Sequence, residues 1–141
     1  MSNIYGISIT EDEQDFVVSV RDLPEVCTAG SSFAEACELA ADAIDAVVCH
    51  RIKTGKNLPR PTQVQAGEIA VSLPLETGTK AELYRAWKIS GISKAELGRR
   101  LNIHETEVRR ILDPRHGTRL EAIERAFKAL GYRLALSAKA F

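Results

Sequence analysis

Within the first 73 residues of the chain, apolar and polar residues alternate in four short stretches. Residues 4–9 and 15–20 are the first two stretches, and the polar residues between them predict an antiparallel hairpin. A short third strand is expected over residues 26–29 and a fourth over residues 69–73. Between these two, apolar residues recur at three- and four-residue steps, which predicts a long helix over residues 32–53. The order βββαβ predicts a small α+β layer.

Helical periodicity dominates the second half of the chain. A capping box at Thr79 predicts a helix to about Gly91, and residues 75–78 are the expected hinge between the two halves. Another capping box at Thr118 predicts a helix that ends at Gly131. The apolar residues expected to face inward on the predicted helices include Phe33, Leu83, Ile89, Leu120, Ile123 and Phe127.

Residues 132–136 alternate like a strand at the end of this helical half. A lone strand leaves backbone groups unpaired, so we expect it to pair with the same strand of a second copy and to form a dimer. A tetramer is the alternative, because an edge of the N-terminal sheet could pair as well. The predicted architecture is an α+β domain over residues 1–76 and an all-α domain over residues 77–141 that ends in a dimerising strand.

Two short helices joined by a tight turn are predicted between Ile92 and Leu112. Ser93 can cap the first helix, and Gly98 leaves room for the second helix to cross closely. Asn102 falls at the turn, where a left-handed conformation is needed and Asn tolerates it. This spacing is typical of a DNA-binding helix-turn-helix, and a packed helix pair without a nucleic-acid role is the alternative. The second helix is expected to bury Val108, Ile111 and Leu112.

The outward face of the second helix carries the predicted base contacts. Arg109 is the strongest candidate, because an arginine can read guanine through two hydrogen bonds. The carboxylates of Glu105 and Glu107 repel phosphate, although a carboxylate near a helix N-terminus interacts favourably with the helix dipole. A contact from Glu105 to a cytosine amino group and a capping role for Glu107 are the interpretations left open. Phosphate contacts are expected at the start of the first helix and in the loop after the second. The candidate DNA-binding residues are Lys94, Glu105, Thr106, Arg109, Arg110, Arg115, His116 and Arg119.

The overall net charge of zero hides a strong asymmetry between the two halves. Residues 1–76 hold five Lys or Arg and twelve Asp or Glu, a net charge of −7, whereas residues 77–141 hold fourteen and seven, a net charge of +7. A basic half favours a polyanion and an acidic half favours a basic partner. The competing interpretation is that the two halves neutralise each other by docking together.

No enzyme, metal or cofactor is expected. His50, His104 and His116 lack ligand spacing, and the three cysteines have no paired short spacings. The first strand lacks the carboxylates that hold the two magnesium ions of a ribonuclease H, and no Ser-His-Asp arrangement or glycine-rich phosphate loop occurs. Without a long apolar run or a signal peptide, we expect a cytoplasmic protein that has reduced thiols and does not span a membrane.

Four short motifs in the first half resemble the HicB antitoxins and follow in the same order. They are Asp-Leu-Pro at residues 22–24, Thr-Ala-Gly at 28–30, Phe-Ala-Glu-Ala at 33–36 and Pro-Arg-Pro at 59–61. The second half resembles the helix-turn-helix domain that many of these proteins carry. The resemblance implies an antitoxin that neutralises a HicA toxin, a small basic ribonuclease that cleaves mRNA with a histidine.

The resemblance also implies a fold and a set of partners. Residues 1–76 are expected to form a partial ribonuclease H-like domain without nuclease activity, and the complex is expected to repress its own operon. A dimer would read an inverted repeat in operator DNA. Arg21 and Glu25 stand where family members often have small residues. A transcription regulator that responds to a small ligand, with no toxin, is the alternative function. The candidate toxin contacts are Asp22, Leu23, Pro24 and Glu25, for which solvated loop charge is the competing interpretation.

Overall fold

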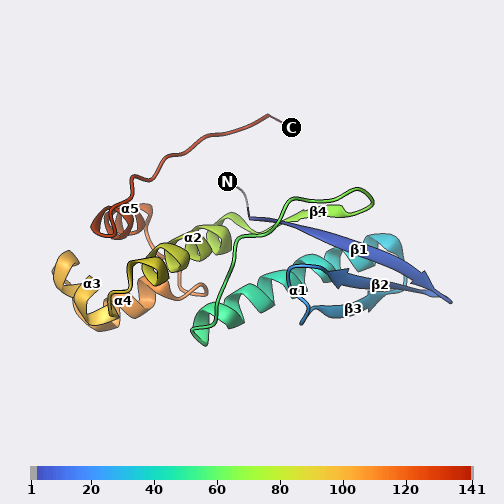
Figure 1. Cartoon of the computed structure of the whole chain (residues 1–141), viewed down its shortest axis with the longest axis horizontal. Helices are drawn as coiled ribbons and strands as arrows, with labels where there is room; N and C mark the ends of the chain where they lie inside the picture. Colours follow the sequence, from blue (N-terminus) through green and yellow to red (C-terminus); the bar gives the residue numbers. More distant parts are fainter. Residues whose placement is uncertain (1–2, 141) are drawn as a thin grey trace. The chain divides into compact units, whose positions relative to one another are not determined.

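A four-stranded antiparallel sheet and five helices make up the fold, which a computed structural model describes for residues 3–140 (Figure 1). The chain divides into two compact units between Gly78 and Thr79. The sheet and the first helix lie in the first unit, and the last three helices lie in the second. The strands are β1 (Ile4–Asp12), β2 (Asp15–Val20), β3 (Cys27–Gly30) and β4 (Ile69–Ser72). The helices are α1 (Phe33–Lys53), α2 (Leu75–Ser90), α3 (Lys94–Leu101), α4 (Glu105–Leu112) and α5 (Leu120–Ala129).

The sheet has the strand order β3-β2-β1-β4, and all neighbouring strands are antiparallel. The first two strands form the predicted hairpin, but β1 continues to Asp12 instead of ending at residue 9. The polar residues expected to form the connection pair with β2 as far as Asp12 opposite Asp15, so only two residues remain in the turn. Glu13 in that turn has a φ of 56°, the left-handed conformation that a tight hairpin requires.

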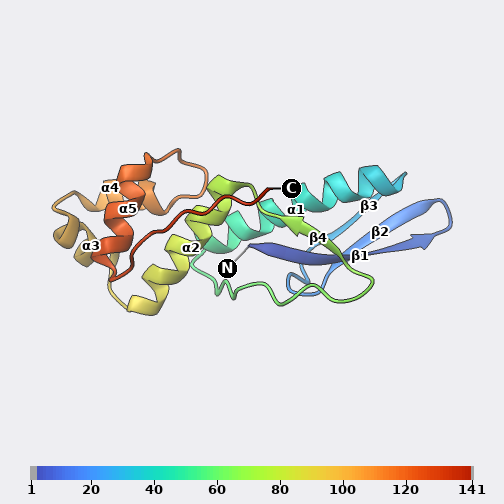
Figure 2. The same ribbon diagram turned by 90° about the horizontal axis from the view of Figure 1, so that it is seen from above.

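Helix α1 covers one face of the sheet and closes the core of the first unit (Figure 2). Ile7 lies opposite Val20 in the register of β1 and β2, so both side chains point to the same face and both are buried. Ser32 caps the helix as predicted, since its hydroxyl accepts a bond from the N–H of Glu35 at 3.1 Å. Phe33 was expected in the buried stripe, but it is 52% exposed because it is the first residue of the helix. The buried residues of α1 are Ala36, Ala40, Ile44, Val48, Cys49 and Ile52.

Helix α2 begins earlier than the sequence indicates. Residues 75–78, the expected hinge, form its first turn, and the N–H of Gly78 donates to the carbonyl of Pro74 at 2.9 Å. Thr79 therefore lies inside the helix and cannot act as its N-cap. Ile89, expected on the inner side, is 77% exposed near the end of the helix. The end of the helix close to Gly91 agrees with the prediction.

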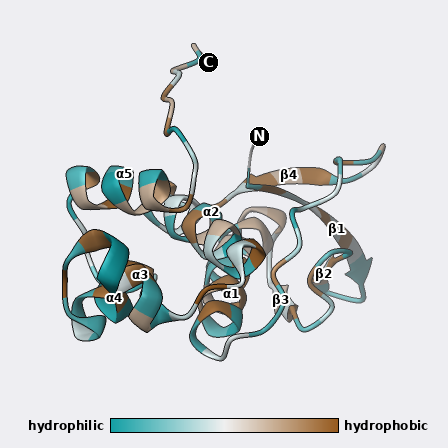
Figure 3. Cartoon of the chain, turned by 60° about the vertical axis from the view of Figure 1, so that its left-hand side comes forward, coloured by the Kyte–Doolittle hydropathy of each residue, from teal (hydrophilic) through white to brown (hydrophobic). Residues whose placement is uncertain are grey.

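The second unit is built around one hydrophobic cluster from α2, α3, α4 and α5. The amphipathic character of α5 is visible as alternating teal and brown along its turns (Figure 3). Helix α5 starts at Leu120 with Arg119 as N-cap, so the capping box predicted at Thr118 is not formed and Leu120 is 66% exposed. The buried members of the cluster are Leu83, Ala86, Leu97, Leu101, Val108, Ile111, Leu112, Ile123, Ala126 and Phe127.

The segment after α5 leaves the helix as an extended chain without regular secondary structure in residues 132–140 (Figure 1). The strand predicted over residues 132–136 is therefore not formed among the described residues, whose sheet consists of β1 to β4. Tyr132 packs edge-on against Phe127 with 6.4 Å between ring centroids, and Leu134 packs against the cluster. Pairing of this segment with a second copy stays a prediction.

Candidate functional site

The turn between α3 and α4 has the geometry that the sequence predicts. The hydroxyl of Ser93 accepts a bond from the N–H of Glu96 at 3.0 Å and so caps α3. Asn102 has φ 55° and ψ 46°, the left-handed conformation, and ends α3. The N–H of Ile103 then donates to the carbonyl of Gly98 at 2.9 Å. A Cβ at Gly98 would lie only 2.9 Å from the carbonyl oxygen of Ile103, so the close approach of the turn requires glycine.

Helix α4 separates its side chains into a buried and an exposed face. Val108, Ile111 and Leu112 are buried in the cluster, as expected. We call the exposed side of α4 the reading face, because the sequence analysis predicts the base contacts there. Its residues are Glu105, Thr106, Glu107, Arg109 and Arg110.

Both carboxylates of the reading face pair with an arginine one turn further along α4. Glu105 contacts Arg109 at 3.3 Å between Oε1 and Nη2, and Glu107 contacts Arg110 at 2.5 Å between Oε1 and Nη1. Arg109 and Arg110 are 64% and 54% exposed, so both guanidinium groups remain accessible to solvent and to a partner. The structure therefore gives Glu107 an ion pair within the helix in place of the capping role considered from the sequence.

Lys80 of α2 holds the C-terminal end of α4, a role that the sequence analysis missed. Its side chain is buried, and its Nζ donates to the carbonyls of Arg110 at 3.2 Å and Ile111 at 2.5 Å. The same ammonium donates to the hydroxyl of Thr118 at 2.7 Å. A cation at the negative end of a helix dipole is favourable, and here it also fixes the loop before α5. The only available signal was a lysine within an otherwise apolar helical stripe.

A hollow of about 290 Å³ lies beside the reading face, between α4, the following loop and α5. Arg110, His116 and Arg119, all predicted from the sequence, meet there with Arg125 of α5, which the sequence analysis did not select. Leu101, Ile103, Ile111 and Ala122 supply apolar lining. Such a combination of arginines beside apolar lining suits a sugar–phosphate backbone.

The other two predicted phosphate contacts are Lys94, at the start of α3, and Arg115, in the loop after α4. Lys94, the first residue of α3, places its Nζ 5.6 Å from the centre of the Trp87 ring, a cation–π contact. Arg115 lies in the exposed loop after α4, where its backbone N–H donates to the carboxylate of Asp113 at 2.9 Å. Neither residue lines the hollow.

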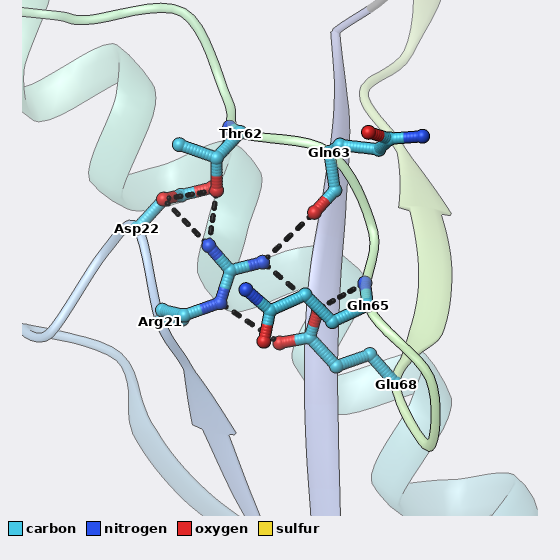
Figure 4. A network of polar contacts seen from close by, with 6 residues as sticks. All are labelled: Arg21, Asp22, Thr62, Gln63, Gln65 and Glu68. Atoms are coloured by element: carbon cyan, nitrogen blue, oxygen red, sulfur yellow. Dashed lines mark hydrogen bonds and ion pairs between the residues drawn. The ribbon is translucent and has the colours of Figure 1, made fainter.

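The expected toxin contacts of the first unit lie in a turn that is tied down by polar contacts. Arg21 is the centre of this network and donates to both carboxylate oxygens of Glu68, at 3.2 and 2.9 Å, and to the hydroxyl of Thr62 (Figure 4). The carboxylate of Asp22 accepts from the N–H of Thr62 at 2.8 Å. The guanidinium of Arg21 lowers the pKa of Glu68 below its ordinary value and thereby favours the ion pair. The network holds the loop before β4 against the end of β2.

A second ion pair holds the other end of the same turn. Arg51 of α1 donates from Nε and Nη2 to the two oxygens of Glu25, both at 2.7 Å. Leu23 is buried, whereas Pro24 is exposed. Arg21 and Glu25, the two departures from the family pattern, are thus both occupied by internal ion pairs. The structure shows Asp22, Leu23 and Glu25 in structural contacts, and their contact with a toxin stays a prediction.

The Glu25–Arg51 pair predicts a pH-dependent contribution to stability. Hydrogen bonds from Arg51 lower the pKa of Glu25 from 4.5 to about 2. Because the Glu25 side chain is 42% exposed, solvent screening limits the pair to about 1 kcal/mol. Glu25→Gln should lower the free energy of unfolding by that amount at pH 7. Because the pKa of Glu25 is lower in the folded state, the ion pair stabilises the fold fully only when the pH is above the unfolded-state pKa of about 4.5. The difference in free energy of unfolding between Glu25→Gln and the unaltered chain should therefore shrink as the pH falls from about 4.5 towards 2.

Urea unfolding followed by circular dichroism between pH 7 and pH 2.5 measures this difference. Glu38→Gln, at an exposed position of α1, is the matched control that should change little at any pH. Equal stability of Glu25→Gln and the unaltered chain at pH 7 would contradict the assignment.

Metal and membrane sites receive no support from the described part of the chain. No group of three or more His, Cys, Asp or Glu residues among residues 3–140 is placed to hold a metal ion. The cysteines are free thiols, exposed at Cys27, half-buried at Cys37 and buried at Cys49. No described helix is long and apolar enough to cross a bilayer.

Comparison with known proteins gives matches over nearly the whole chain. Residues 4–82 match a family model described as HicB-like antitoxin of bacterial toxin–antitoxin system. Antitoxin HicB of Pseudomonas fluorescens (strain Pf0-1) is 31% identical over 137 residues, which are 96% of this chain and 94% of that protein. Antitoxin HicB of Escherichia coli (strain K12) is 32% identical over 133 residues, 94% of this chain and 96% of that protein. The crystal structure of the N-terminal domain of Burkholderia pseudomallei antitoxin HicB aligns with a TM-score of 0.42 and 22% identity, covering 51% of this chain and 99% of that one.

Proposed function

This chain belongs to the HicB-like antitoxins of bacterial toxin–antitoxin systems, and we propose that it neutralises a HicA-type mRNA-cleaving toxin and represses its own operon. The observation that carries the DNA-binding half of the proposal is the α3–turn–α4 geometry. A left-handed Asn102 joins two short helices, and the second presents five polar side chains to solvent. This arrangement supports a helix-turn-helix whose second helix, α4, is the one expected to enter the major groove.

Charge supports the division of labour between the two units. The acidic half of the chain, −7 over residues 1–76, suits a toxin that must itself be basic to grip RNA. The basic half, +7 over residues 77–141, suits the phosphates of operator DNA. The βββαβ order of the first unit supports a partial ribonuclease H-like domain that binds without catalysing. The two proposed partners, operator DNA and a toxin that acts on mRNA, support a cytoplasmic location.

A homodimer fits the same proposal. The extended segment after α5 offers unpaired backbone groups to a second copy, and Leu136 on it is 88% exposed. Two copies of α4 related by a two-fold axis would read the two halves of an inverted repeat about one duplex turn apart. A tetramer would follow if an edge of the sheet paired as well.

Arg109→Ala tests the proposal in the full-length protein. The variant should bind a duplex taken from upstream of its own coding sequence roughly 10- to 100-fold more weakly, because a bidentate contact to guanine is lost. It should still co-purify with the tagged product of the neighbouring toxin-sized reading frame, because the toxin contacts are expected in the first unit. Gel shift and affinity co-purification measure the two properties.

Arg99→Ala is the matched control for this experiment. Arg99 is 70% exposed and also pairs with a glutamate, Glu96 at 2.6 Å, but it lies on α3. Its replacement should alter DNA binding much less than that of Arg109. Undiminished DNA binding by Arg109→Ala would refute the assignment of the reading face. DNA binding without any toxin capture would favour a ligand-responsive regulator.

A further inference from the structure

The reading face of α4 carries no net charge, although it belongs to a strongly basic half of the chain. Its four ionic side chains are two carboxylates and two guanidinium groups, and each carboxylate contacts one guanidinium. Residues 77–141 as a whole carry +7. The helix that should touch the bases thus adds no net charge of its own to attract phosphate.

These ion pairs are too exposed to serve mainly as stabilising contacts. Glu105 and Arg109 are 46% and 64% exposed, and Glu107 and Arg110 are 49% and 54% exposed. Exposed pairs one turn apart on a helix are weak and exchange readily with water. A partner that offers an arginine two hydrogen bonds can therefore displace its carboxylate at little cost, whereas a phosphate only exchanges one anion for another.

One histidine and two arginines without such partners lie beside the reading face. His116, Arg119 and Arg125 line the hollow next to α4, and none of them pairs with a carboxylate among the described residues. Glu107 lies on the wall of the same hollow. The flank of α4 therefore offers positive charge to a phosphate backbone, whereas the reading face has no net charge.

We propose that Glu105 and Glu107 set the preference of this protein for its operator by neutralising Arg109 and Arg110 on all other DNA. The inference rests on the proposed operator binding. On a sequence without matching guanines, each arginine stays with its glutamate and the reading face adds nothing to affinity. On the operator, two hydrogen bonds to a guanine replace the carboxylate contact. The glutamates therefore lower non-specific affinity more than specific affinity.

Four full-length variants with the same change in charge test this proposal. Glu105→Gln and Glu107→Gln remove the carboxylates of the reading face. Glu96→Gln removes a carboxylate that pairs with Arg99 and Arg100 on α3, and Glu124→Gln removes an exposed one on α5. The probes are a duplex from upstream of the coding sequence and a shuffled duplex of equal length and composition. Dissociation constants are measured for both at several salt concentrations.

Glu105→Gln and Glu107→Gln should each bind the shuffled duplex about 3- to 10-fold more tightly, because a freed arginine reaches phosphate. The logarithmic salt dependence of that binding should steepen by nearly one unit. Binding to the upstream duplex should tighten less, because the arginines are already released there. The ratio of the two dissociation constants should therefore fall at least threefold, whereas Glu96→Gln and Glu124→Gln should keep it within about twofold.

Equal tightening on both duplexes, or an equal fall of the ratio in Glu96→Gln, would overturn the proposal in favour of a general charge effect. Weaker binding of Glu105→Gln to the upstream duplex alone would also overturn it for that residue and assign a direct contact to cytosine. Equal binding of the two duplexes by the unaltered chain would refute the proposed operator function, and this inference with it.

Discussion

Replacing Lys80 with methionine is expected to lower the free energy of unfolding of the second unit by about 2–4 kcal/mol. Lys80 is only 4% exposed, and its ammonium donates to the carbonyls of Arg110 and Ile111 and to the hydroxyl of Thr118. Methionine preserves the apolar stem but has no hydrogen to donate, so these acceptors lose a buried donor. The negative end of the α4 dipole also loses its cation.

Fluorescence of Trp87 during urea unfolding measures this loss directly. Trp87 is the single tryptophan of the chain and packs against the cluster of the second unit, so its signal reports that unit. Lys128→Met is the matched control, because Lys128 is exposed on α5. An unfolding midpoint of Lys80→Met equal to that of Lys128→Met would show that the buried ammonium does not hold α4 in place.

The sequence predicts the α3–α4 pair well because every signal for it is local. Ser93, Gly98 and Asn102 each act on backbone groups within a few residues, and all three have the expected geometry. The strands follow from alternation for the same reason. The alternation does not indicate how far β1 runs, since that depends on its pairing with β2 as far as Asp12.

Contacts between distant residues are what the sequence does not reveal. Lys80 meets acceptors at least 30 residues further along the chain, and Arg21 meets Glu68 across 47 residues. The spacing of apolar residues along a helix also does not indicate how far the elements packed against that helix extend. Phe33 and Leu120 are each the first residue of a helix, and both are exposed instead of buried. In both helices the buried residues begin only after the first helical residue.

Gly98→Val should be similarly damaging, for a steric reason. A Cβ at this position would lie 2.9 Å from the carbonyl oxygen of Ile103 and 3.4 Å from Cγ2 of Val108. The first neighbour is backbone in the tight turn and cannot rotate away, so α4 must shift relative to α3. We expect a loss of about 2–3 kcal/mol in the second unit, the range typical of overpacking in a core. Binding to the upstream duplex should fall as well, because the reading face moves with α4.

Gly117→Val separates this clash from the general effect of placing valine where glycine stood. A Cβ at Gly117 would meet no atom within 4 Å, and its φ lies outside the left-handed region, so the substitution there should change stability by less than about 1 kcal/mol. Gly98→Ala should fall between the two variants, because the better helix propensity of alanine, about 1 kcal/mol, offsets part of the clash. Trp87 fluorescence during urea unfolding measures the stability of all three variants. An equal unfolding midpoint in urea for Gly98→Val and Gly117→Val would contradict this expectation. It would show that α3 and α4 have room to separate, so that the close approach at Gly98 does not fix the position of α4.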